Sequence, residues 1–245
     1  MAAMIRTAAA LFFVALCIFL VLPFFLLYTL ISGSSALMYA VAMRALRIAL
    51  RMGGVQVRVS GVENIPAGPC IFAANHVSNL DPPTLTPFLR KQVAIMAKKE
   101  VFRIPVLGWA MRSAHFVPVD RSDRESAAAS VDQAIRYLRE GVSFLIFAEG
   151  TRSIDGRLKN FKNGTFLMAI EAGVKVVPVS LSGTQRLMRK GSSVIRPGVA
   201  TIRFGPAVDA SQYSLDQRQE LRDRVHELVA AGLEEDQKPA PESNS

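Results

Sequence analysis

A histidine and an aspartate follow an apolar run, at a spacing that could form a general base. The run Cys70–Ala74 predicts a buried strand, and His76 and Asp81 come directly after it. Imidazole has an unperturbed pKa near working pH, so it can take a proton and return it. A neutral histidine base needs one ring nitrogen free and the other held by an acceptor. Because the Asp81 carboxylate could be that acceptor, the pair predicts proton-transfer chemistry.

The spacing works only if the segment between the two side chains is not helical, since five residues of regular helix turn through about 140°. Pro82 and Pro83 follow the aspartate. Proline is favoured at the first helical position and disfavours helix in the residue before it. We therefore expect a helix from Pro82 and a loop from His76 to Asp81. In the alternative interpretation Asp81 only caps that helix and His76 has no chemical role.

Charged groups also follow three other predicted strands. They are Lys98 and Lys99 after 93–97, Arg121 after 115–119, and Glu149 to Arg152 after 143–147. Strand ends at one edge of a sheet are where α/β proteins usually bind ligands. This recurrence predicts a single rim that binds an anion.

The segment Glu149-Gly150-Thr151-Arg152 suits a phosphate-binding turn. Glycine lets the backbone turn sharply and approach a ligand closely. Thr151 supplies a hydroxyl, and Arg152 supplies a planar fork that matches two phosphate oxygens. The alternative is a polar turn in which Glu149 and Arg152 pair with each other.

The composition favours an anionic partner. The 245 residues carry a formal net charge of +9, which suits nucleic acid, an anionic membrane surface or a phosphorylated substrate. Nucleic acid is the weakest of these, because zinc-finger spacing and an aromatic-basic signature are both missing from the sequence. Cys17 and Cys70 make no disulfide framework and indicate reduced thiols. The three histidines are far apart, so no metal site is predicted.

The N-terminal segment 1–52 is predicted to hold the chain on a membrane. The apolar run 8–31 is long enough to cross a hydrocarbon core of about 30 Å. A signal peptide is the alternative, although the run exceeds an h-region of about 15 residues. Pro23 could kink this helix or let it turn back without crossing. The amphipathic helix 36–52 follows.

Three arginines of the helix 36–52 share one face: Arg44, Arg47 and Arg51. They suit a helix in the membrane interface with arginines towards anionic headgroups, or an amphipathic helix packed on the domain. With only Arg6 ahead of the apolar run, the positive charge favours a cytoplasmic C-terminal part. We therefore expect the inner membrane, with the catalytic domain on its cytoplasmic side.

The rest of the chain predicts one α/β domain, 53–233, with a mostly parallel sheet flanked by helices. Expected strands are 55–60, 70–74, 93–97, 115–119, 143–147, 174–181 and 199–205. Expected helices are 82–89, 101–112, 165–172, 214–233 and a helix capped by Ser122 or Asp123 that ends at Arg139. A mobile basic loop is expected at 186–196. The acidic, proline-containing tail 234–245 is predicted to be disordered.

These stretches together resemble the lysophospholipid and glycerolipid acyltransferase family, in particular its 1-acyl-sn-glycerol-3-phosphate acyltransferases. Asn75, His76 and Asp81 match the family's Asn-His-x4-Asp motif, and 147–153 matches Phe-Pro-Glu-Gly-Thr-Arg-Ser with Ala148 in place of proline. Arg121 matches the arginine that ends another motif, without the glycine that usually precedes it. The similarity spans about 55–208 in the family's order.

The resemblance implies transfer of a fatty acyl group from a thioester of coenzyme A or acyl carrier protein to a lysophospholipid hydroxyl. His76 would deprotonate that hydroxyl and Asp81 would fix the imidazole tautomer. The phosphate of the acceptor would be bound by a basic rim. Its expected members are Arg121, Glu149, Gly150, Thr151, Arg152, Lys98 and Lys99. Within it, Glu149 would orient Arg152, a lysine or a glycerol hydroxyl. No cofactor is expected, since the acyl donor is a substrate.

The leading hypothesis is acylation of 1-acyl-sn-glycerol-3-phosphate (lysophosphatidic acid) to phosphatidic acid in phospholipid biosynthesis. Another acceptor, such as a lyso-ornithine lipid or a different lysophospholipid, is the runner-up. A hydrolase that uses His76 to activate water is a second class, although Gly-x-Ser-x-Gly is missing from the sequence. A non-catalytic adaptor that binds anionic membrane is a third. Expected partners are the bilayer, the lysophospholipid and the acyl donor, without nucleic acid.

Overall fold

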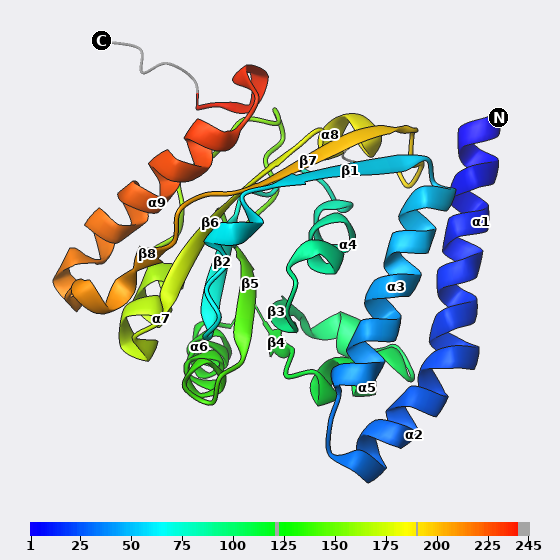
Figure 1. The fold of residues 1–245 in the computed structure, drawn as a ribbon, viewed down its shortest axis with the longest axis horizontal. Coiled ribbons are helices and arrows are strands. Elements are labelled where there is room, and N and C mark those ends of the chain that lie inside the picture. Colours follow the sequence, from blue (N-terminus) through cyan, green and yellow to red (C-terminus); the bar gives the residue numbers. More distant parts are fainter. Residues whose placement is uncertain (121–122, 190, 240–245) are drawn as a thin grey trace.

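The computed structural model describes residues 1–120, 123–189 and 191–239. Its centre is a sheet of eight strands in the order β1-β7-β6-β2-β5-β3-β4, with β8 paired to β6. Figure 1 shows this sheet between two groups of helices, with the N-terminal helices at one side. The strands are β1 (Val55–Ser60), β2 (Cys70–Ala74), β3 (Val93–Lys98), β4 (Val117–Val119), β5 (Ser143–Phe147), β6 (Lys175–Ser182), β7 (Gly198–Phe204) and β8 (Val208–Asp209).

The central strands are apolar at almost every position because both faces of the sheet are covered. Side chains of β2 alternate between two cores. Ile71 and Ala73 pack with residues of α6 (Arg124–Arg139), α7 (Gly164–Ala172) and α9 (Arg218–Gly232). Cys70, Phe72 and Ala74 pack on the other side with Leu85 and Leu89, beside α4 (Asp81–Leu85).

The strands that precede the charged segments run in one direction. β2 is parallel to β5 and β6, and β3 is parallel to β4 and β5. Only β7 and β8, among the described strands, pair antiparallel with β6. The carboxyl ends of β2, β3 and β5 therefore meet at one edge of the sheet. The predicted fold class, a mostly parallel sheet flanked by helices, is confirmed.

One helix differs from its predicted bounds, and another helix was not predicted. The 101–112 segment begins as a 3-10 turn, Lys99–Arg103, and becomes regular only in α5 (Leu107–Ser113). Pro105 and the positive φ of Val106 separate the two parts. A short helix, α8 (Thr184–Leu187), lies in the region expected to be a mobile basic loop, of which Lys190 is outside the described residues.

The N-terminal segment is a long helix that bends. α1 (Ala2–Leu16) continues through a π-helical turn, Cys17–Val21, into α2 (Leu22–Ser32). The wider turn precedes Pro23, which has no N–H to donate to the preceding turn. Within the described residues this is the one helix long and apolar enough to cross a membrane. The chain turns back only after Ser32.

Helix α3 (Ala36–Met52) runs back beside α1 and packs against the α/β part (Figure 1). Arg47 donates to the carbonyl of Pro87, and its guanidinium lies 4.8 Å from the centre of the Phe88 ring. The hydroxyl of Tyr39 accepts a hydrogen bond from Val93 N at 3.3 Å. Arg47 therefore faces the domain, which agrees with the second of the two interpretations, an amphipathic helix packed on the domain.

The predicted disorder of the tail was wrong for residues 234–239, while 240–245 lie outside the described residues. Residues Glu235–Gln237 form a 3-10 turn, and Gln237 has no exposed surface. The Gln237 carbonyl accepts Leu158 N at 2.9 Å, and Arg186 forms ion pairs with Glu234 and Asp236. Polar composition alone predicts disorder, but here the polar groups find partners in the loop that contains Leu158 and in helix α8.

Candidate active site

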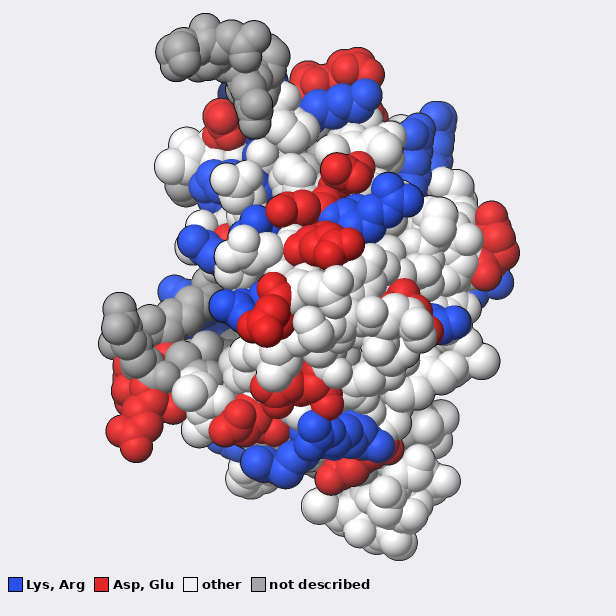
Figure 2. Space-filling model, turned by 90° about the vertical axis from the view of Figure 1, so that its left-hand side faces the viewer, with Lys and Arg blue, Asp and Glu red and all other residues white. Residues whose placement is uncertain are grey.

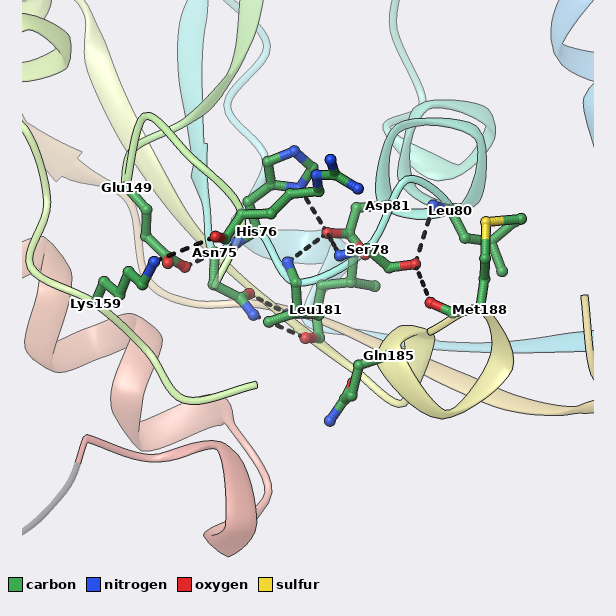
Figure 3. Close-up of polar contacts among 12 residues, drawn as sticks. Asn75, His76, Ser78, Leu80, Asp81, Glu149, Lys159, Leu181, Gln185 and Met188 are labelled. Atoms are coloured by element: carbon green, nitrogen blue, oxygen red, sulfur yellow. Dashed lines mark hydrogen bonds and ion pairs between the residues drawn. The ribbon is translucent and has the colours of Figure 1, made fainter. Parts of the chain in front are cut away.

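The predicted His-Asp pair is assembled at the end of β2. Nδ1 of His76 lies 2.7 Å from Oδ2 of Asp81. Figure 3 marks the contact between the two side chains. The same oxygen accepts the N–H groups of Val77 at 2.7 Å and Ser78 at 2.8 Å, and Asp81 has no exposed surface. Helix α4 begins at Asp81, one residue before the predicted start. The loop therefore folds the carboxylate back onto the ring and leaves Nε2 as the free nitrogen.

Asn75 anchors the start of this loop. Its Oδ1 accepts Leu181 N at 2.8 Å and its Nδ2 donates to Leu181 O at 3.0 Å, so one side chain pairs with both main-chain groups of a β6 residue (Figure 3). The ring of His76 stacks on Phe147, with ring centres 4.2 Å apart. Asn75 belongs to the recognised motif, but sequence reasoning assigned it no role.

The segment after β5 holds the main chain of His76 from both sides. Oε1 of Glu149 accepts His76 N at 2.8 Å, and Ser153 N donates to His76 O at 2.8 Å. Glu149 is 2% exposed. The expected partners of Glu149 were Arg152, a lysine or a glycerol hydroxyl, and a lysine, Lys159, does lie close enough to lower its pKa. The contact with His76 N was not expected. A sequence pattern does not reveal this contact, because the two residues are 73 positions apart.

Burial gives Glu149 an unusual charge state. Loss of solvent is the main cause that raises its pKa to about 7, assisted by the nearby negative charge of Asp81, while Lys159 and the His76 N–H act in the opposite direction. Lys159 was not predicted from the sequence. Its Nζ donates to Arg152 O at 3.2 Å.

The turn that follows Glu149 exposes the groups suited to an anion. Gly150 has a φ of +75°, and a Cβ there would meet Lys162 Cγ at 3.3 Å. Thr151 is exposed and Arg152 is half-buried. Within the part of the chain that the structure describes, no hydrogen bond or ion pair engages the Arg152 guanidinium. A phosphate could therefore bind Arg152 without displacing an internal partner.

The other residues of the predicted anion-binding rim are Lys98, Lys99 and Arg121, and only the first is exposed without an ion pair among the described residues. Lys98 is exposed at the end of β3, beside β4. Lys99 forms an ion pair with Asp120, which raises the pKa of its ammonium group. Lys99 is therefore not a free cation in this structure. Arg121 lies outside the described residues.

An apolar groove of about 350 Å³ separates the N-terminal helices from α5. Its lining is almost entirely hydrocarbon and comes from three sides: Val14, Ile18 and Leu22; Met38, Ala42 and Leu46; Leu107, Met111 and Phe116. Such a groove accepts an aliphatic chain.

Comparison with known proteins places these residues in a family. A family model described as Acyltransferase matches residues 56–182. The chain is 40% identical over 142 residues to the chloroplastic 1-acyl-sn-glycerol-3-phosphate acyltransferase LPAT1 of Arabidopsis thaliana, which covers 57% of this chain and 40% of that protein. It is 31% identical over 192 residues to a 1-acyl-sn-glycerol-3-phosphate acyltransferase of Limnanthes douglasii, covering 78% and 68%.

A solved structure agrees with the family model and with these relatives. The crystal structure of the 1-acyl-sn-glycerophosphate (LPA) acyltransferase PlsC from Thermotoga maritima superposes with a TM-score of 0.81 and 31% identity. The superposition covers 94% of this chain and 93% of that one. With this agreement in sequence and fold, the chain belongs to the acyltransferase family, as the resemblance of its motifs predicts.

Proposed function

We propose that the chain transfers a fatty acyl group from acyl-CoA or acyl carrier protein to the sn-2 hydroxyl of 1-acyl-sn-glycerol-3-phosphate. The product is phosphatidic acid, an intermediate of phospholipid biosynthesis. The observation that carries the proposal is the contact of 2.7 Å between His76 Nδ1 and the fully buried Asp81. The relatives named as 1-acyl-sn-glycerol-3-phosphate acyltransferases indicate the acceptor.

In the proposed reaction His76 is the general base. Its free Nε2 takes the proton of the acceptor hydroxyl while that oxygen attacks the thioester carbonyl. Asp81 keeps the proton on Nδ1 and stabilises the imidazolium that forms. Collapse of the tetrahedral intermediate forms the ester and expels the thiolate, which can receive the proton from His76. No acyl-enzyme is required, so transfer is direct.

The acceptor's phosphate is assigned to the exposed turn after β5. Arg152 offers a planar pair of donors, which matches two phosphate oxygens. The Thr151 hydroxyl and the Lys98 ammonium lie on the same edge of the sheet and supply further donors. Arg121 and Lys99 remain candidates from the sequence, although Lys99 would first have to leave Asp120.

Membrane association follows from the N-terminal helices. Large apolar side chains are exposed along α1 and α2, including Phe12 at 70%, Phe24 at 74% and Ile31 at 79%. The face around α7 and α9 instead carries basic and acidic side chains side by side, as Figure 2 shows. We infer that α1 and α2 contact lipid and that the sheet lies on the cytoplasmic side of the inner membrane. The apolar groove beside them would receive an acyl chain.

The test is acylation by the purified full chain in liposomes. Labelled acyl-CoA and acyl carrier protein are supplied in turn with lysophosphatidic acid, a lyso-ornithine lipid, other lysophospholipids or no acceptor. We expect phosphatidic acid as the main product. Acylation of another lysolipid in its place would contradict the acceptor assignment, and free fatty acid without an acceptor would indicate a hydrolase.

The variant His76→Ala distinguishes the acyltransferase proposal from a non-catalytic adaptor. Under the acyltransferase proposal the wild-type chain acylates lysophosphatidic acid and this variant does so only slowly. An adaptor would bind anionic liposomes and release no labelled product with either chain. Transfer activity that persists in His76→Ala would contradict the base assignment.

A further inference from the structure

Glu149 lies where the parallel pairing of β2 and β5 breaks down. The last paired residue of β2 is Ala74, whose carbonyl accepts Ala148 N at 3.0 Å. In a regular parallel ladder the next bond would run from His76 N to Ala148 O. That carbonyl instead accepts Lys162 N at 2.7 Å. The His76 N–H is left without its ladder partner, and Oε1 of Glu149 takes that place at 2.8 Å.

The position of the His76 ring depends on the Glu149 carboxylate, which accepts the N–H that the Ala148 carbonyl would otherwise accept. Ser153 N donates to the carbonyl of His76, so both main-chain groups of residue 76 are held by the segment after β5. The ring itself is held by Asp81 and stacks on Phe147. Figure 3 shows Glu149 and Asp81 on opposite sides of His76. Loss of the Glu149 contact would free the N–H of His76, while the Ser153 contact to its carbonyl and the ring contacts remain.

We propose that Glu149 is a positioning residue, which replaces a missing main-chain acceptor and holds His76 so that Nε2 reaches the acceptor hydroxyl. It does not bind the acceptor's phosphate. This inference rests on the proposed function and changes the role that the sequence assigned to Glu149. With 2% of its surface exposed, the carboxyl group has no access to a ligand in this structure.

To position His76, residue 149 needs only an oxygen that accepts the His76 N–H. With a pKa of about 7, Glu149 is partly protonated near neutral pH. An ionised carboxylate and the carbonyl oxygen of a carboxylic acid can both accept the His76 N–H. A glutamine carbonyl can accept it as well. The conservative variant Glu149→Gln should therefore keep the contact, whereas Glu149→Ala removes it and leaves a buried N–H without a partner.

The experiment measures kcat and acceptor KM for both variants in liposomes with lysophosphatidic acid. We expect Glu149→Ala to lower kcat by about 10²-fold, as for a misplaced catalytic group, with acceptor KM within about threefold of wild type. Glu149→Gln should keep kcat within about threefold. Arg152→Gln provides the contrast, because it should raise acceptor KM instead.

A second measurement does not depend on turnover. Diethyl pyrocarbonate modifies histidine rings, and peptide mapping separates His76 from His115 and His226. We expect His76 to react faster in Glu149→Ala than in wild type or Glu149→Gln, with the other two histidines unchanged. Equal His76 reactivity in all three proteins would overturn the positioning role.

The two proposals fail in different ways. A wild-type chain that acylates no lysolipid would refute the proposed function, while the modification rates would still test the role of Glu149. A higher acceptor KM with unchanged kcat in Glu149→Ala would overturn the positioning role and return Glu149 to the acceptor site. If Glu149→Ala does not fold, a folded Glu149→Gln that has lost kcat would overturn it.

Discussion

The Asp81 carboxylate is wholly buried and uses one oxygen, Oδ2, to hold both the His76 ring and the N–H groups of Val77 and Ser78. The residue therefore has two functions at the same atom. It closes the loop that follows β2, and it fixes the tautomer and direction of the imidazole. Replacing it with alanine would leave two buried N–H groups without an acceptor, so a cleaner test keeps an oxygen in place.

We expect Asp81→Asn to fold and to lower kcat by about 10²–10⁴-fold, because the amide keeps an acceptor but cannot stabilise the imidazolium. His76→Ala should cause a loss of similar size. Because the two residues act as a unit, the double variant should be about as slow as either single one. Multiplicative losses in the double variant would contradict this. Rates are measured with labelled acyl donor in liposomes.

Arg152 is expected to act on binding of the acceptor. Arg152→Gln removes a charge-assisted contact with phosphate, a loss of about 1.5–3 kcal/mol, so acceptor KM should rise about 10–100-fold while kcat changes little. Arg136→Gln, an exposed position on α6, controls for the loss of one positive charge. Equal acceptor KM values in the two variants would count against the phosphate role. The same assay with varied lysophosphatidic acid measures both.

Glu149 should make the stability of the chain depend on pH. Its pKa is raised from 4.5 to about 7 in the folded state, so between these values the folded chain holds a proton that the unfolded chain has lost. Its contribution is therefore full below about pH 4.5 and falls as pH rises towards 7. At about 1.4 kcal/mol per pKa unit, the loss between pH 4.5 and about 7 is at most about 3.5 kcal/mol.

The variant Glu149→Gln isolates this contribution, since every other titrating group is shared. Denaturant unfolding in detergent micelles at several pH values gives the free energy of unfolding of each protein. Wild type should lose more stability than Glu149→Gln between pH 5 and pH 7. Parallel pH profiles would show that Glu149 titrates at an ordinary pKa.

The bounds of β2 and β5 could be predicted from the sequence, whereas the contacts that hold the site could not. The strand expected at 115–119 begins only at Val117, because His115 has a positive φ of 64°. β2 and β5 are continuous apolar runs, so both observed strands have the predicted ends. α8 and β8 were missed because four and two residues carry no periodicity. Asn75 with Leu181, and Glu149 with His76, join residues 106 and 73 positions apart. Such pairs depend on strand register, which local patterns do not specify.

Thr7 should anchor the N-terminal helix to the domain. Its Oγ1 accepts Ile195 N at 2.9 Å, and that N–H is buried. Thr7→Val removes the acceptor and should lower the free energy of unfolding by about 1–3 kcal/mol. Thr29→Val is the matched control, because the Thr29 hydroxyl donates only to Phe25 O of its own helix. Equal melting temperatures for the two variants in detergent would contradict the anchoring role.

The segment 234–239 is expected to hold the loop that follows the turn 149–152, which is proposed to bind phosphate. Removal of 234–245 takes away the Gln237 carbonyl, which leaves Leu158 N without its acceptor, and deprives Arg186 of two exposed carboxylates. The buried hydrogen bond dominates, because exposed ion pairs contribute little. We expect a loss of about 2 kcal/mol in the free energy of unfolding.

The same deletion should raise acceptor KM more than it lowers kcat, because the freed loop carries Lys159, whose Nζ contacts the carbonyl of Arg152. Removal of 240–245 alone is the control, since it leaves Gln237 in place. Thermal melting and acceptor titration of both truncated chains provide the measurement. If the two deletions behave alike, docking of 234–239 contributes neither to stability nor to the acceptor site.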